Sequence, residues 1–488
     1  MLPRTIKFWV HCIFIIIMAT GCLPKAGTIP PTETGEQISP TVIPDPSAFP
    51  GAEGFGTETP GGRFGRVIAV TNLNDTTDPN SSKYYGSLRW ALEQTWPDDP
   101  DDPYDQRRII IFKVGGEINL ADVLYVQHPF VTIAGQSAPG DGITLRREQV
   151  TIVTHDVVIR GMRFRVGDEG GFTCCRDGLN ITTTSADSDV YNVVIDHCSI
   201  SWGIDENVST HVDPQKNYSM HDVTIQWSII SEGLHHSIHV DEGSSDVDAH
   251  SMGMLLGQDG YNVTIHHNLF AHNWGRNPRV SGIDRLEIVN NLIYGWDNAA
   301  IEFSDDRSTV QIVKNYFKAN DDSRPFEINL HEPMDPDSQV YLEGNVSDDD
   351  RSKRGLEAVR IKNLESFELA SAPLFTSELI VTSPEDAYQD VLDRAGVTWP
   401  IRDAVDRRIV KQVKKRSGTI IDSESQVGGW PNYQNGSYAM DTDDDGIPDD
   451  WEISHGLDLN DASDASSAQK ISPNGFTWIE EYVNSLFL

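Results

Sequence analysis

Short segments of alternating apolar and polar residues recur between turns from about residue 49 to residue 320, and none keeps a helical period. Six of them share one nine-residue frame with apolar second, fourth and ninth positions: 156–164, 192–200, 222–230, 262–270, 285–293 and 309–317. Their starts lie 36, 30, 40, 23 and 24 residues apart. The shortest spacings indicate one coil, and the longer ones a coil with a loop insertion. The pattern predicts an all-β solenoid, in which each coil packs against its neighbours.

The seventh position of this frame is Asn in the last three copies, Asn268, Asn291 and Asn315. Stacked coils bring these side chains into register, where they can hydrogen-bond one another and the backbone. We therefore expect a right-handed parallel β-helix. An antiparallel β-sandwich is the alternative, but it does not explain the asparagine column.

The chain divides into four segments. Residues 1–22 have Arg4 and Lys7 before a mostly apolar run, and small residues precede Cys22, which resembles a bacterial lipoprotein processing site. We expect export, either as a secreted protein after ordinary cleavage or as an outer-membrane lipoprotein anchored through Cys22. A Pro/Thr-rich tether (23–48), the β-helix with a C-terminal wrap (49–432) and a small acidic calcium-binding module (433–488) follow.

The composition is strongly acidic, with 74 Asp and Glu against 38 Lys and Arg and a formal net charge of −36. This charge disfavours binding to nucleic acid, and a polyanionic ligand needs locally reversed charge or a bridging cation. We expect a monomer.

The acidic module contains a candidate calcium loop from Asp441 to Glu452. Oxygen ligands occupy loop positions 1, 3, 5, 9 and 12, and Gly446 stands at the sharp-turn position 6. The predicted ligands are Asp441, Asp443, Asp445, Asp449 and Glu452. The alternative is a solvated acidic face.

Two further groups of charged residues fall within the solenoid. Asp177 lies roughly one expanded coil before Asp205 and Glu206, and stacking can bring their carboxylates together. Carboxylates that meet repel unless they are protonated or bind a cation, and hard oxygen ligands suit Ca²⁺. Capping of turns is the plainer role for Asp177 and Asp205. Arg276 and Arg279 follow a strand two coils later, where they can hold an anionic sugar.

Five motifs, at 49–56, 86–89, 195–207, 266–279 and 427–431, together resemble the pectate lyases of polysaccharide lyase family 1, especially the pectate trisaccharide-lyase branch; Asp205 and Glu206 stand in the third, and Arg276 and Arg279 in the fourth. The resemblance implies calcium-dependent β-elimination of α-1,4-polygalacturonate (pectate) to 4,5-unsaturated oligogalacturonides. It implies calcium ligands at Asp177 and Asp205, a catalytic arginine at Arg276 that removes the C5 proton, and a substrate-binding Arg279.

The chain departs from the family pattern at three positions. A further calcium ligand is replaced by Ser209, so we expect Glu206 to supply the missing carboxylate. A substrate-binding lysine is replaced near His250 or Met252, and we assign His250 to the substrate site. A further arginine is replaced by Ser281.

Several alternatives stay open at this stage. A guanidinium, with a pKa above about 12, is an awkward base, so His235, His250 or His272 can serve instead. A glycoside hydrolase or a non-catalytic, calcium-dependent polysaccharide-binding protein competes with the lyase. Zinc at His235 and His239 is disfavoured, because two histidines four apart share a face on a helix rather than in a β-repeat loop.

Three cysteines remain after the predicted signal. Cys198 lies about one coil after Cys174 and Cys175 and can pair with either; otherwise all three pack as small apolar residues.

Overall fold

The computed structural model describes residues 46–97, 104–169, 175–240, 247–321, 323–349 and 356–487. Contacts divide the chain into residues 1–44 and one compact unit, residues 45–488, and only the second is described here. The predicted signal with Cys22, most of the tether and Cys174 lie outside the described residues. Within them, no helix is both long and apolar enough to cross a membrane.

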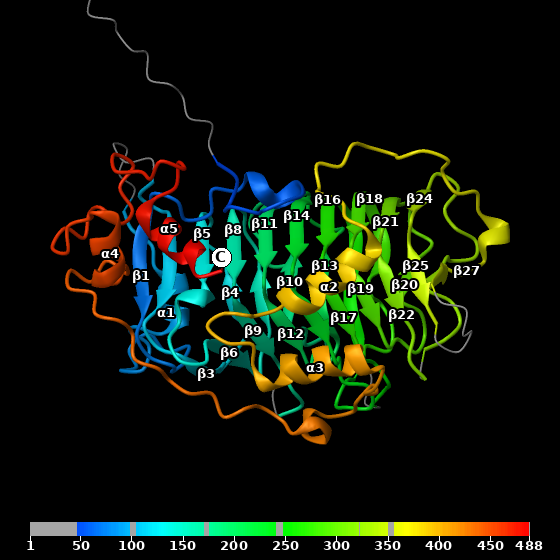
Figure 1. Cartoon of the computed structure of the whole chain (residues 1–488), viewed down its shortest axis with the longest axis horizontal. Coiled ribbons are helices and arrows are strands. Elements are labelled where there is room, and N and C mark those ends of the chain that lie inside the picture. The colour runs from blue at the N-terminus through cyan, green and yellow to red at the C-terminus, as the bar shows by residue number, and fades with distance from the viewer. Residues whose placement is uncertain are drawn as a thin grey trace, which may run out of the picture. The chain divides into compact units, whose positions relative to one another are not determined.

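The body of the described unit is a parallel β-helix with three faces (Figure 1). The first face contains β4 (Leu124–Val126), β7 (Val150–Ile152), β10 (Leu179–Thr182), β13 (Glu206–His211), the first parts of β16 (Met252–His266) and β18 (Arg279–Val289), β20 (Ile301–Phe303), β23 (Ile328–Asn329) and β27 (Ile361–Lys362). The second contains β1 (Arg66–Val70), β2 (Arg108–Phe112), β5 (Val131–Ala134), β8 (Val157–Arg160), β11 (Val190–Asp196), β14 (Met220–Gln226), the later parts of β16 and β18, β21 (Thr309–Val313) and β24 (Gln339–Glu343).

The third face is a separate sheet of β3 (Gly116–Asn119), β6 (Ile143–Arg146), β9 (Met162–Arg165), β12 (Ser199–Ser201), β15 (Ile229–Ser231), β17 (Leu269–Ala271), β19 (Leu292–Tyr294), β22 (Tyr316–Lys318), β25 (Val346–Asp348) and β26 (Leu356–Ala358). Among the described strands, every pair is parallel except β25 with β26. The expected parallel β-helix is confirmed.

The fourth position of the sequence frame forms a continuous apolar stack inside the second face. Each residue is the register partner of the next, and all of them are buried: Ile159, Ile195, Ile225, Ile265, Ile288 and Ile312. A β-branched side chain packs well on a pleated surface, so one buried position repeated in every coil builds the core.

The asparagine column is also present. Asn291 Oδ1 accepts from the backbone N–H of Asn268 at 2.9 Å, and Asn315 Oδ1 accepts from that of Asn291 at 2.8 Å. The ladder extends by one rung at each end, to Ser228 and Asn345. The seventh position therefore supplies hydrogen bonds that tie successive coils together.

Cys198 occupies this same frame position one coil before Ser228. It is a buried free thiol, so Cys198 does not pair with Cys174 or Cys175, a pairing that the sequence left open. Its side chain packs in the apolar core, which is the alternative role we considered.

The C-terminal wrap covers the third face with α2 (Pro384–Arg394) and α3 (Ala404–Lys415). Val391 and Ile409 pack against Leu292 and Tyr294, in agreement with the helical spacing of residues 403–415. The remaining helices are α1 (Leu88–Glu93), α4 (Asp449–His455), α5 (Trp478–Ser485) and the short 3-10 helices η1 (Phe55–Glu58), η2 (Gly135–Ser137), η4 (Leu364–Ser366) and η5 (Glu424–Val427).

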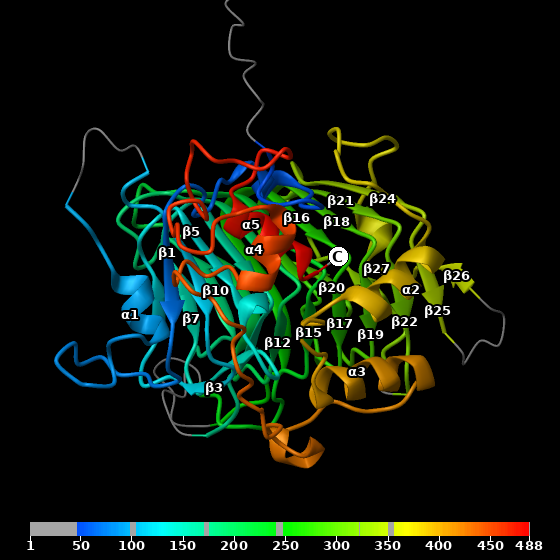
Figure 2. The same ribbon diagram turned by 60° about the vertical axis from the view of Figure 1, so that its left-hand side comes forward.

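The acidic C-terminal segment packs directly on the first coils. Ile479 of α5 shares an apolar cluster with Ile109 and Ile111, and Figure 2 shows α5 beside β5. Buried Arg63 donates from Nε to Glu480 at 3.0 Å. The expected boundary near residue 432 is therefore not marked by a break in contacts, because residues 45–488 form one compact unit.

Candidate active site and acidic tail group

The candidate active site lies at the starts of strands on the first face. Asp177 precedes β10, and Glu206 begins β13. Because Leu179 is the register partner of Val208, Asp177 lies beside Glu206, whose N–H donates to Asp177 Oδ1 at 3.0 Å. Carboxylate oxygens of Asp177, Asp205 and Glu206 lie within 4.8 Å of one another. Stacking thus brings together the three carboxylates that the sequence singled out.

Arg276 reaches this group from the loop before β18. Its guanidinium donates to Glu206, and its backbone N–H donates to Glu302 Oε1 at 2.9 Å. Arg276 has φ of 56°, a left-handed conformation that it shares with other turn residues of the coils, such as His267 and Arg285. The positively charged Arg276 side chain is therefore held at the edge of the carboxylate group.

The electrostatics of the three carboxylates are unequal. Burial, followed by the charge of Asp205, raises the pKa of both Asp177 and Glu206 well above the usual range, and Arg276 opposes this increase. Burial also acts to raise the pKa of Asp205, but hydrogen bonds and the charge of His250 lower it to about 2. Three buried carboxylates can all ionise only when a cation compensates them, so the cluster suits a hard divalent ion.

Ser209 and Ser281 show how the departures from the family pattern are accommodated. The Ser209 hydroxyl donates to Asp177 Oδ2, so this position orients a carboxylate rather than supplying one. The Ser281 hydroxyl donates to Asp306 Oδ2 at 2.6 Å. Glu206, in contrast, lies within the carboxylate group, where we expected a replacement ligand.

A row of register partners runs along the first face beside this cluster: Asn180, Ser209, Leu255, Arg279, Glu302, Asn329 and Lys362. Near its end lies a hollow of about 300 Å³, lined in part by Trp274, Arg324 and Lys362. The row therefore joins the carboxylate cluster to a surface with basic side chains.

The histidines fall into different environments. His250 Nε2 lies 2.6 Å from Asp205 Oδ1, while His235 contacts the backbone oxygen of His250 through Nδ1 at 2.9 Å. His272 is fully buried beside Tyr294, at the end of β17 on the third face, so it cannot contact a substrate on the first face. This burial removes His272 from the alternative bases.

Two contacts of the site were missed by the sequence reasoning. Glu302 belongs to no motif, and only the register of β18 with β20 places it beside Arg279. His239 was considered together with His235 as a zinc pair, but its ring stacks instead on that of His250. No local sequence signal predicts either contact.

The acidic tail forms a second carboxylate group. Oxygens of Asp441, Asp443 and Asp445 lie within 4.8 Å of one another, and the same holds for Asp445, Glu452 and Asp464. Asp464 was not anticipated. Asp449, predicted as a ligand, instead accepts from the N–H of Thr442 at 2.7 Å and from its hydroxyl at 2.8 Å.

The tail carboxylates include oxygens without a hydrogen-bond partner among the described residues. Both oxygens of fully buried Glu452, Asp445 Oδ2 and Asp464 Oδ1 are in this state. Burial, followed by the charges of neighbouring carboxylates, raises the pKa of Asp445 to about 8, although the hydrogen bond from the Ile447 backbone N–H opposes this increase. Burial and adjacent carboxylates raise the pKa of Glu452 to about 7. Unpartnered buried carboxylates are costly unless a cation binds them.

Comparison with curated proteins identifies close relatives. The chain is 34% identical over 452 residues to the probable pectate lyase C of Aspergillus flavus, covering 90% of this chain and 94% of the relative. It is 33% identical over 446 residues to the probable pectate lyase C of Emericella nidulans, covering 90% and 92%. These fungal relatives give no support to the bacterial lipid anchor expected at Cys22.

Solved structures include similar chains, whereas no protein-family model matches. A pectate lyase from Bacillus sp. N165 in complex with trigalacturonate is 17% identical, with a TM-score of 0.47 and coverage of 71% of this chain and 99% of that one. The cedar pollen allergen jun a 1 is 17% identical, with a TM-score of 0.45 and coverage of 76% and 93%. On the identity and near-complete coverage of the curated relatives, the chain belongs to the pectate lyases and is a polysaccharide lyase.

Proposed function

We propose that the protein is a calcium-dependent pectate lyase that cleaves α-1,4-polygalacturonate by β-elimination and releases 4,5-unsaturated oligogalacturonides. The observation that carries the proposal is the contact of the Arg276 guanidinium with Glu206 inside the three-carboxylate group. The proposed cation site is thus adjacent to an arginine, so that one can bind a uronate carboxylate while the other lies near the neighbouring C–H.

Asp177, Asp205 and Glu206 are the proposed calcium ligands. Their donor set is all oxygen, and burial makes it unfavourable for all three to be charged unless a cation is bound. When bound, Ca²⁺ supplies Lewis-acid stabilisation of the charge that develops on the substrate carboxylate. Ser209 orients Asp177 through its hydroxyl and so supports the site without adding charge.

Arg276 is the proposed catalytic residue. The C5 proton of a galacturonate unit is α to its carboxylate, so its removal creates enolate-like charge that a guanidinium can stabilise. Glu302 accepts a hydrogen bond from the Arg276 backbone N–H. Arg279 is the register partner of Glu302 on the neighbouring strand and is proposed to bind a substrate carboxylate. His250 already contacts Asp205, so it acts at the edge of the carboxylate group; His235 is the other histidine retained as an alternative base.

The direct test incubates the purified full-length protein with polygalacturonate, with and without a chelator, and follows the ultraviolet absorbance of the unsaturated product. We expect absorbance that depends on calcium. We expect Arg276→Lys to lower the rate by about 100-fold or more, because lysine cannot reproduce the guanidinium fork. Arg285→Lys, on the second face, is the matched control.

The alternatives give different results in the same assay. A hydrolase produces new reducing ends without the absorbance, and a binding protein produces neither. Wild-type rates in a folded Arg276→Lys variant would remove Arg276 from the mechanism.

We also propose a structural calcium ion in the tail, held by Asp441, Asp443, Asp445, Glu452 and Asp464. The support is the set of buried carboxylate oxygens that lack partners among the described residues. Asp449 accepts hydrogen bonds from the N–H and the hydroxyl of Thr442, and we propose that it stabilises the loop conformation. This ion contributes to folding rather than to proton abstraction, because α5 anchors the tail on the second face.

Export is the remaining part of the proposal. Arg4 and Lys7 followed by an apolar run indicate an export signal. An exported enzyme fits a polymeric substrate that is too large to enter a cell.

A further inference from the structure

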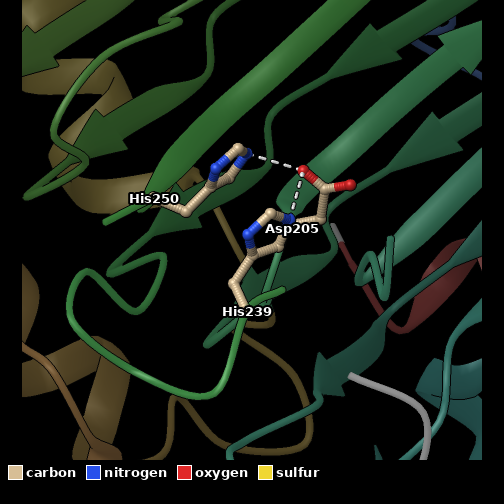
Figure 3. Close-up of side chains that lie close together, drawn as sticks. All are labelled: Asp205, His239 and His250. Atoms are coloured by element: carbon tan, nitrogen blue, oxygen red, sulfur yellow. Dashed lines mark ion pairs between the residues drawn. The ribbon is translucent and has the colours of Figure 1, made fainter. Parts of the chain in front are cut away.

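Two histidine rings, those of His239 and His250, stack beside Asp205 of the carboxylate group (Figure 3). The rings of His239 and His250 lie 4.1 Å apart between centroids and 19° from parallel. Both Nε2 atoms face Asp205 Oδ1, at 3.8 Å for His239 and 2.6 Å for His250. One carboxylate oxygen and two imidazole nitrogens therefore lie within 4.8 Å of one another.

Neighbouring groups hold both histidines in this orientation. Asp248 binds His239 at Nδ1, which leaves Nε2 as the ring atom that faces Asp205. The Asp248 backbone N–H also donates to the His239 carbonyl at 3.2 Å. His250 is fixed through its backbone, since its N–H donates to the His235 carbonyl at 2.8 Å and its carbonyl contacts His235 Nδ1 at 2.9 Å.

This arrangement has the features of a metal site with nitrogen ligands. A metal-binding histidine commonly donates its second ring N–H to a carboxylate, as His239 is placed to do with Asp248. In a tetrahedral zinc site with bonds of about 2.0–2.1 Å, donor atoms lie roughly 3.3 Å apart, between the two distances found here. Imidazole selects zinc-class ions, whereas Ca²⁺ prefers oxygen alone.

We propose that Asp205, His239 and His250 form a binding site for a zinc-class transition-metal ion, distinct from the calcium group and sharing Asp205 with it. Because Asp205 serves both groups, occupation of the nitrogen site draws a ligand away from calcium. Zinc-class ions therefore inhibit the lyase in competition with Ca²⁺. This inhibitory consequence rests on the proposed function, whereas metal binding itself does not.

Cobalt is the probe for binding. Calcium-free full-length protein is titrated with Co²⁺, and the visible bands of nitrogen-ligated, low-coordinate cobalt are recorded without substrate. We expect such bands in the wild type and at least a 10-fold loss of cobalt affinity in His239→Gln and His250→Gln. Asp248→Asn should weaken binding about 10- to 100-fold by releasing His239. His236→Gln, an exposed histidine in the same loop, is the matched control.

The outcomes separate the possibilities. Absence of nitrogen-type bands in the wild type would overturn the proposal and leave the histidines as ion-pair partners of Asp205. Unchanged affinity in folded His239→Gln and His250→Gln would overturn it as well. If either variant fails to fold, Asp248→Asn against His236→Gln decides. Inhibition by Zn²⁺ that excess Ca²⁺ relieves supports the shared ligand, whereas cobalt bands in a protein without lyase activity would refute only the proposed function.

Discussion

Replacing Asn291 with Leu tests whether the asparagine ladder holds the coils together. Leucine has a similar shape but no polar atoms, so the substitution removes hydrogen bonds with little change in volume. Asn291 is fully buried. Its Oδ1 accepts from the backbone N–H of Asn268 at 2.9 Å and from Asn268 Nδ2 at 3.1 Å, and its Nδ2 donates to the Ile265 carbonyl at 2.8 Å.

These three partners are used for the expected cost, and the further bonds from Asn291 Nδ2 to Asn315 Oδ1 and the Val289 carbonyl can only add to it. The Asn268 backbone N–H, one Asn268 side-chain N–H and the Ile265 carbonyl lose their bonds to Asn291. An unsatisfied buried polar group costs about 1–3 kcal/mol, so three such groups give an expected loss of about 3–9 kcal/mol in the free energy of unfolding. A domain typically has only about 5–15 kcal/mol in total, so the effect is large.

Urea unfolding followed by tryptophan fluorescence at fixed calcium concentration measures this loss. Asn432→Leu, at an exposed position in the C-terminal wrap, is the control and should change stability by less than about 0.5 kcal/mol. A loss below about 1 kcal/mol in Asn291→Leu would refute the reasoning, because the ladder would then contribute no more than a single surface contact.

The remaining predictions concern the metal sites and acid stability. Asp177→Asn should raise the calcium concentration for half-maximal rate about 10-fold or more. An unchanged calcium concentration would mean that Asp177 caps a turn and does not bind calcium. Glu452→Gln should reduce the rise in melting temperature on adding Ca²⁺ while preserving activity, and Glu385→Gln, at an exposed position of α2, should retain the full rise; equal shifts in both would contradict the tail site. Burial lowers the pKa of His266 to about 4 and that of His267 to about 2, from 6.5. The unfolded state therefore takes up protons first, and stability should fall as the pH drops from about 6.5 to 4, by about 3 kcal/mol for His266 alone. The free energy of unfolding should fall less steeply with decreasing pH in His266→Gln than in the wild type. An identical slope would show that His266 does not cause the loss of stability in acid.

The sequence by itself determined the β-helix and part of its chemistry. One frame repeated in six segments predicts that equivalent positions stack, and the structure confirms both the isoleucine stack and the asparagine ladder. Such positions can be predicted because each is defined by its place within one coil. The grouping of Asp177, Asp205 and Glu206 was predicted for the same reason, since each stands at the start of a strand on one face.

Tertiary structure alone decided the contacts made by loops of irregular length. Glu302 reaches Arg276 from another coil, and His239 meets His250 only because the inserted loop between β15 and β16 folds back on Asp205. In the tail, Asp464 joins the carboxylate group, while Asp449 accepts a hydrogen bond from the Thr442 N–H. Insertions change the number of residues between coils without changing the stacked frame, so sequence spacing carries no information about where their side chains meet.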